Sequence, residues 1–103
     1  MQVFTINYVP SKEIEALGLV TGNVVQAKHI GRDLMAGLKN IAGGEIKSYT
    51  DMLTESRVIA RERMIAEAEA LGADAIISVR FDASSVMEGT SEILAYGTAV
   101  KIL

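Results

Sequence analysis

The sequence between Leu71 and Ile102 constrains the fold more than any other stretch of the chain. A long amphipathic run stops at Gly72, the apolar segment Ala75–Asp82 follows, and a second such segment spans Glu92–Ile102. Glycine after a helical pattern is typical of a helix end, and short apolar runs rich in β-branched residues are typical of strands. We therefore predict helix, stop, strand, turn and strand. This stretch contains no recognisable catalytic constellation.

The N-terminal third predicts strands. Residues 2–8 alternate in polarity as far as Pro10, which predicts a first strand. The run Ile14–His29 is rich in β-branched residues and is interrupted by glycines. It predicts either one long strand or a pair of strands with a bend at Thr21–Asn23.

Two helices are predicted next. Leu34, Leu38 and Ile41 fall at helical spacing, which predicts a short helix closed by Gly43-Gly44. The long amphipathic helix follows and runs to Leu71, with cap oxygens offered at its start by Ser48, Thr50 and Asp51.

The apolar positions of the long helix form a main arc, which must face a sheet. Its members are Met52, Leu53, Ile59, Ala60, Met64, Ala66, Ala70 and Leu71. Val58 and Ile65 point nearly the opposite way, which favours a second buried face against a neighbouring subunit. The alternative is that both are isolated surface aliphatics, which are ordinary in soluble proteins. Arg63 and Glu67, spaced i to i+4, are placed to pair at the margin of the core.

Alternation along the last two strands assigns side chains to faces. The strand that begins at Ala75 places four side chains on one face: Ala75, Ile77, Val79 and Phe81. The last strand has two sets of side chains on opposite faces. One set is Leu94, Tyr96, Val100 and Ile102, and the other is Ile93, Ala95, Gly97 and Ala99. The set with Ala95, Gly97 and Ala99 has mostly small side chains, which lets a helix approach the sheet closely. We therefore expect any larger side chain at Gly97 to push helix and sheet apart, at a cost of about 1–3 kcal/mol in stability.

Composition predicts one domain, residues 1–103, that needs partners of its own kind. Half of the residues are hydrophobic and the mean hydropathy is +0.28, whereas a domain this small leaves much of its surface in water. Large exposed apolar patches usually mark interfaces. We therefore expect a closed, symmetric homo-oligomer.

Charge and residue usage exclude several functions. The net charge is −3 without clustered Lys or Arg, which gives no electrostatic reason to bind nucleic acid or a membrane surface. No apolar run reaches the ~20 residues of a bilayer span, and no export signal precedes the first strand, so we expect a cytoplasmic protein. The absence of cysteine removes disulfides and thiolate metal cages.

Several motifs, taken together, resemble one protein family. They are Gly31-Arg32-Asp33, Ala36-Gly37-Leu38, Gly43-Gly44-Glu45, Tyr49, Arg57, Leu71–Ala75 and Ala95–Val100. In this order, over nearly the whole chain, the sequence is similar to the YbjQ-like family. The resemblance implies an α+β fold of the dodecin-like type, with a two-layer arrangement of an antiparallel sheet against one long helix plus a short helix (ββααββ). It also implies a ring of five subunits, no established activity, and a heavy-metal-binding label.

The donor inventory bears on that label. Soft metals select thiolates and thioethers and borderline metals select imidazole, whereas the chain has no Cys, one His and five Met. One subunit therefore supplies no zinc site of the usual Cys and His type. The alternative is a site repeated by symmetry around a ring, built from His29, Asp33, Glu45 or a carboxylate between Asp82 and Glu92.

Two sets of residues are candidates for binding another ligand. Arg32, Asp33 and Arg57, with Arg80-Phe81-Asp82, are candidates for an anion pocket, whereas Tyr49 and Tyr96 are candidates for stacking on a planar ligand between subunits. The competing interpretation is that Asp33 caps the short helix, the arginines bridge subunits and Tyr96 belongs to the core or an interface.

The leading hypothesis for function is a non-catalytic homo-oligomeric binding or scaffold module, a pentamer by the family resemblance. The alternatives are metal binding by symmetry-repeated ligands and an unrecognised enzyme that uses Arg32, Asp33 and Arg57. The hydroxyls of the predicted turn, Ser84, Ser85, Thr90 and Ser91, are explained by turn chemistry. The sequence identifies no cofactor.

Overall fold

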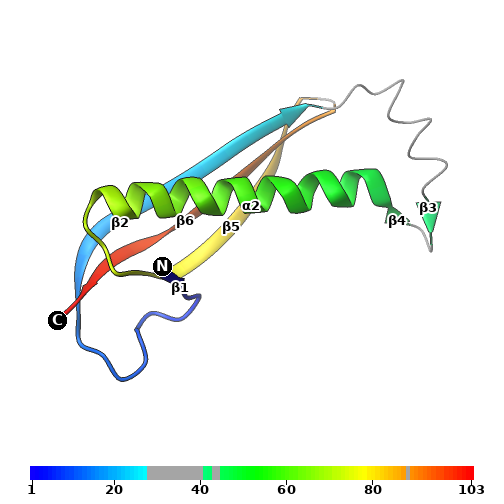
Figure 1. The fold of residues 1–103 in the computed structure, drawn as a ribbon. Coiled ribbons are helices and arrows are strands. Elements are labelled where there is room, and N and C mark those ends of the chain that lie inside the picture. The colour runs from blue at the N-terminus through cyan, green and yellow to red at the C-terminus, as the bar shows by residue number, and fades with distance from the viewer. Residues whose placement is uncertain (28–40, 43–44, 88) are drawn as a thin grey trace.

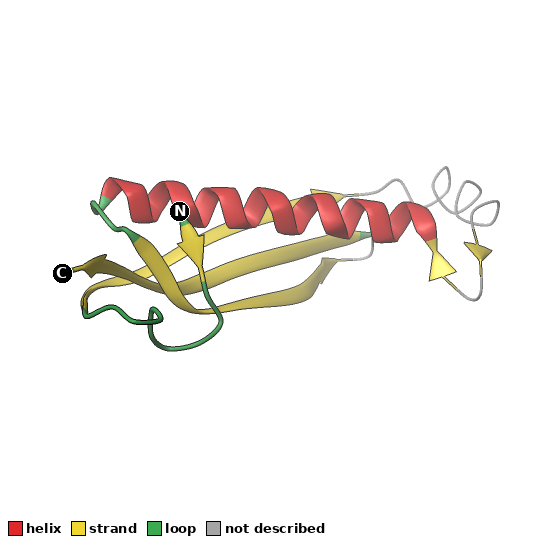
Figure 2. Ribbon diagram, turned by 60° about the horizontal axis from the view of Figure 1, so that its bottom comes forward, coloured by secondary structure: helices red, strands yellow, loops and turns green. Residues whose placement is uncertain are grey.

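The protein is described from a computed structural model, which covers residues 1–27, 41–42, 45–87 and 89–103. The elements in these ranges are β1 (Gln2–Val3), β2 (Ile14–Ala27), β3 (Ile41–Ala42), β4 (Glu45–Ile46), α2 (Lys47–Ala70), β5 (Ala75–Met87) and β6 (Thr90–Ile102). The sheet has the strand order β1-β5-β6-β2, and β3 and β4 form a separate ribbon. Helix α2 lies along one face of the sheet (Figures 1 and 2). The predicted α+β class is confirmed.

The four-stranded sheet is mixed, which corrects the prediction of an antiparallel sheet. β5, β6 and β2 pair antiparallel, whereas β1 runs parallel to β5 through the pairs Gln2 with Ala75 and Val3 with Ile76. β1 is also much shorter than the predicted strand 2–8. The chain leaves the regular ladder after Val3 because β5 bulges there, and Ser78 N donates to Ile6 O at 2.8 Å.

The bulge in β5 changes which side chains share a face. The β5–β6 register shifts between Ile77 and Arg80, and Ser78 has a positive φ of 54°. Ile76 and Val79 therefore both belong to the core beneath α2. Ala75 and Ile77 pack on the other face. The predicted single face through Ala75, Ile77, Val79 and Phe81 is wrong, because the extra residue interrupts the alternation of side chains.

The long strand is unbroken, and the last hairpin extends over more residues than predicted. β2 is one strand, as the first alternative had it, and its irregularity lies between Ala16 and Gly18 rather than at Thr21–Asn23. The β5–β6 ladder continues to the pair Met87 with Thr90. The four hydroxyl residues assigned to a turn, Ser84, Ser85, Thr90 and Ser91, therefore lie on strands.

Helix α2 occupies nearly the predicted span. Its N-cap is Ile46, without a side-chain cap, so Ser48, Thr50 and Asp51 lie inside the helix and do not cap it. The end at Gly72 is confirmed, because this glycine has φ +77° and its N–H donates to Glu69 O at 2.9 Å. None of the helices that the structure describes is long and apolar enough to span a membrane.

The predicted short helix is not tested as a whole. Leu34 and Leu38 lie outside the described residues, as do Gly43 and Gly44. Its last apolar position, Ile41, stands in β3 and pairs with Ile46 of β4. The helical assignment of Ile41 is therefore wrong.

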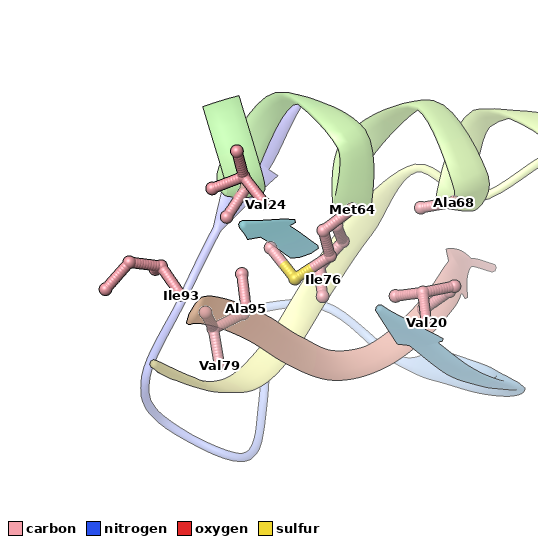
Figure 3. Packing of buried hydrophobic residues seen from close by; sticks show 10 residues of the cluster. Val20, Val24, Met64, Ala68, Ile76, Val79, Ile93 and Ala95 are labelled. Atoms are coloured by element: carbon pink, nitrogen blue, oxygen red, sulfur yellow. The ribbon is translucent and has the colours of Figure 1, made fainter. Parts of the chain in front are cut away.

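The main core lies between α2 and the strands β2, β5 and β6 (Figure 3). The buried line on α2 repeats every fourth residue: Met52, Ser56, Ala60, Met64 and Ala68. A four-residue step drifts by about 40° around a helix, which keeps this line against a twisted sheet. Ala66, Ala70 and Leu71 from the predicted arc are exposed because the buried line drifts away from them.

Two buried glycines set the spacing of this core. A Cβ on Gly22 would collide with the backbone of α2, at Ala60 O and Met64 N. A Cβ on Gly97 would lie 2.8 Å from Ile76 Cγ2 and 2.9 Å from Val79 Cγ2. Gly22 therefore brings helix and sheet together, the role predicted for Gly97. Gly97 instead accommodates the bulged strand β5.

A second, smaller cluster occupies the other face of the sheet. Val9, from the loop after β1, packs there with Ala75, Ile77 and Val100. Near this end Asp74 accepts a hydrogen bond from Ile102 N at 2.8 Å and lies 3.5 Å from Lys101 Nζ. The backbone N–H of Ile102, aided by the Lys101 cation, holds the pKa of Asp74 below its ordinary value of 3.8. The loop covers only the part of this face near the chain termini (Figure 2).

Candidate functional site

Two of the residues predicted to bind a ligand, Arg57 and Tyr96, do not meet within one chain. Arg57 is exposed on α2 and donates to Thr54 Oγ1 at 3.1 Å. Ala95 and Gly97 are buried on the face of β6 that α2 covers, so Tyr96 between them lies on the opposite face. The sheet therefore separates Tyr96 from Arg57. Arg32 and Asp33 lie outside the described residues.

The two residues predicted to form a subunit interface differ in burial. Val58 is 50% exposed on α2, as expected for a side chain that points away from the core. Ile65 is half-buried and packs against the main core cluster. The prediction that both point away from the sheet therefore holds for Val58 alone, because the drift of the buried line brings Ile65 toward the core.

The charged triplet on β5 serves the fold. Arg80 donates through Nη1 to Thr5 O at 2.9 Å and to its own neighbour Val79 O at 2.8 Å, which holds the N-terminal segment against the bulge. Asp82 accepts a hydrogen bond from Ala83 N at 3.0 Å. Both interactions are with the backbone, and neither arranges these side chains as an anion pocket.

Side chains of α2 also hold the outer edge of β2. Arg63 Nη1 donates to Asn23 O at 2.7 Å, and Glu67 Oε1 accepts from Thr21 N at 3.3 Å. Within the described residues Arg63 and Glu67 bind the strand backbone rather than each other, which differs from the pairing predicted. These contacts cover edge groups that a sheet otherwise leaves open to pairing.

A polar hollow that sequence reasoning missed lies between β2 and the first half of α2. It has a volume of about 390 Å³ and is lined by Gln26, Ser48, Asp51, Met52 and Glu55. Ser48 Oγ is buried there and has no hydrogen-bond partner among the residues that the structure describes. The helical spacing of Ser48, Asp51 and Glu55 places these three polar residues near one another in the sequence pattern. It does not indicate the hollow, because Gln26 of β2, which lines the other side, is distant in sequence.

The donor atoms of the residues that the structure describes do not match a heavy-metal site. In the described part of the chain no three residues among His, Cys, Asp and Glu are grouped to hold a metal ion. The thioethers are dispersed, since Met52 and Met64 are buried in the core and Met87 is exposed on β5. The side chains of His29, Asp33 and Glu45 lie outside the described residues. Carboxylate, amide and hydroxyl oxygens suit hard cations rather than soft ones.

Comparisons with known proteins assign the chain to a family. The sequence model of a family described as "Putative heavy-metal-binding" matches residues 1–103. A UPF0145 protein of Vibrio campbellii is 62% identical over 100 residues, which cover 96% of each chain. A UPF0145 protein of Thermotoga maritima is 58% identical over 103 residues, covering 99% of this chain and 97% of that one.

A solved structure supports the fold. It is a protein of unknown function from Pediococcus pentosaceus, described as a member of the DUF74 family, with a TM-score of 0.72 at 17% identity. The match covers 100% of this chain and 98% of that one, and at this identity it bears on the fold alone. From the match over its full length and from relatives near 60% identity, the chain belongs to the YbjQ-like family, whose curated members carry the name UPF0145.

Proposed function

We propose that the protein is a non-catalytic module that associates with copies of itself and acts as a scaffold or binding unit. The observation that carries this is an apolar surface on the sheet, here called the outer face and made of Leu19, Val25, Leu94 and Tyr96. Leu19 is 69% and Tyr96 37% exposed. Val25 is 55% exposed and Leu94 is half-buried. All four positions lie on the face of the sheet opposite α2, because their neighbours along the strands are buried in the core beneath the helix. Exposed apolar surface of this kind marks interfaces.

The shape of the molecule supports the same proposal. The structure measures 53 × 25 × 16 Å and has a radius of gyration of 16.8 Å, whereas a compact chain of this length has about 13 Å. A thin two-layer body has little interior, so it cannot bury all the apolar side chains of a sequence that is half hydrophobic. Further copies of the chain would supply the missing cover.

The family resemblance adds a ring of five to this proposal, and the positions of two residues support a ligand between subunits. Because Arg57 and Tyr96 stand on opposite sides of one sheet, a ligand that contacts both needs Arg57 of one copy and Tyr96 of another. Metal binding, the property in the family's description, gains no support from the dispersed donors, and we assign no role to a metal.

The experiment is a single substitution on the outer face. Leu19→Glu places a charge where another copy would bury a leucine, so native mass spectrometry should show a shift from assembly to monomer. Leu103→Glu is the matched control, because Leu103 is 72% exposed but lies outside the outer face. Circular dichroism should show both variants folded, since neither leucine is buried. A Leu19→Glu protein that assembles like the wild type would contradict the proposal.

A further inference from the structure

Residues 51–61 of α2 carry opposite charges on two flanks of the helix. The buried residues that mark its sheet-facing line are Met52, Ser56 and Ala60. Asp51 and Glu55 each stand one residue before a member of this line, and Arg57 and Arg61 each stand one residue after. Since successive residues turn by about 100°, the acids form one flank and the arginines the other. We name these pairs the acidic flank and the basic flank.

The two flanks lie over different strands. Asp51 and Glu55 line the same hollow as Gln26 of β2, so the acidic flank lies on the β2 side. The basic flank therefore lies on the side of β6 and β5. All four charged side chains are exposed, and within the described residues none of them forms an ion pair. Arg57 spends one N–H on Thr54 Oγ1.

Apolar side chains accompany the basic flank. Val58, next to Arg57, is half-exposed, and Phe81 on β5 is 46% exposed although its neighbour across the ladder, Ala95, is buried. α2 packs mainly on β2 and β6 and contacts β5 much less. No described strand pairs with the outer edge of β5 beyond Arg80. The basic flank thus borders an uncovered shelf with an open strand edge.

We propose that the occupant of this shelf is a second copy of the chain, which docks its acidic flank against the basic flank of the first. The inference rests on the self-association proposed above and names a second surface for it, on the opposite side of the sheet from the outer face. The two flanks are on opposite sides of one molecule, so each copy uses one to receive a neighbour and the other to reach the next. Such a head-to-tail contact is heterologous and closes into a ring when its rotation permits.

The positions of the charges set the geometry of this contact. The midpoints of the two flanks are six residues apart along α2, which corresponds to about 9 Å at 1.5 Å per residue. Neighbouring helices are therefore staggered along their axes. Thr21 N already donates to Glu67, and Asn23 O already accepts from Arg63. At these two residues of β2 the copies are therefore joined by side chains and not by a continuous sheet.

Complementary charges across an interface select the partner and its orientation, and like charges oppose the contact. The double variant Arg57→Glu/Arg61→Glu should therefore weaken assembly at least tenfold in sedimentation velocity, and Asp51→Arg/Glu55→Arg should do the same. The fourfold variant that exchanges all four charges should assemble like the wild type. Restoration is the decisive result, because a variant that merely loses stability is not repaired by two further changes.

The control is Glu62→Arg, which reverses an exposed charge on the same helix outside both flanks and should leave assembly unchanged. If either double variant assembles as tightly as the wild type, or if the fourfold variant fails to regain assembly while circular dichroism shows it folded, the charged-flank interface is wrong. In both cases an assembled wild type leaves the proposed function standing. A wild type that is monomeric throughout overturns both.

Discussion

At the scale of single residues, two glycines show what sequence reasoning reaches and what it misses. A glycine inside a strand indicates a close approach, and both Gly22 and Gly97 do sit where a Cβ has no room. The sequence does not say which neighbour approaches. At Gly22 the neighbour is the backbone of α2, and at Gly97 it is the bulged strand β5. The bulge lies at Ser78, so no glycine in β5 indicates it in the sequence.

The sharpest prediction at this scale concerns Gly22. Gly22→Ala places a methyl group against Ala60 O and Met64 N, which are helix backbone atoms and cannot move aside as a side chain can. We expect a loss of about 1–3 kcal/mol or more in the free energy of unfolding, measured in urea. Asn23→Ala, on the exposed side of the same strand, should change it by less than about 0.5 kcal/mol. Equal stability of the two variants would refute this account of the helix–sheet contact.

At the scale of elements, the features that depend on residues close in sequence could be predicted, and the features that depend on distant contacts could not. The period of α2 and its stop at Gly72 identified the long helix, because both depend on neighbours within a turn. The segments after Ala75 and before Ile102 were identified as strands for the same reason. The parallel pairing of β1, the bulge at Ser78 and the β3–β4 pairing through Ile41 depend on distant contacts that no local pattern encodes.

The packing of α2 is tested by replacing methionine with alanine at a buried and at an exposed position. Met64 of α2 is fully buried between the helix and the sheet, whereas Met87 is 64% exposed on β5. Met64→Ala should cost about 2–5 kcal/mol of unfolding free energy. Met87→Ala should cost less than about 0.5 kcal/mol. Chemical denaturation followed by circular dichroism measures both. Similar costs for the two would mean that the line through Met64 is not the core of the helix–sheet layer.

At the scale of the whole molecule, composition predicted an excess of apolar surface but not its location. The structure places it on the outer face around Leu19 and on the shelf around Phe81. The candidate ligand residues Arg57 and Tyr96 both occur in the motifs that resemble the family, but they were predicted for different ligands, and the fold puts them on opposite sides of the sheet. A motif records which residues matter together, and in an assembly those residues can belong to different copies.

The central claim is that further copies of the chain cover the apolar surface that one copy leaves bare. Sedimentation equilibrium of the wild-type protein, diluted stepwise through the micromolar range, tests it most directly. We expect a particle whose mass is a multiple of 11.0 kDa and does not change on dilution. A folded, stable particle of 11.0 kDa at every concentration would contradict it.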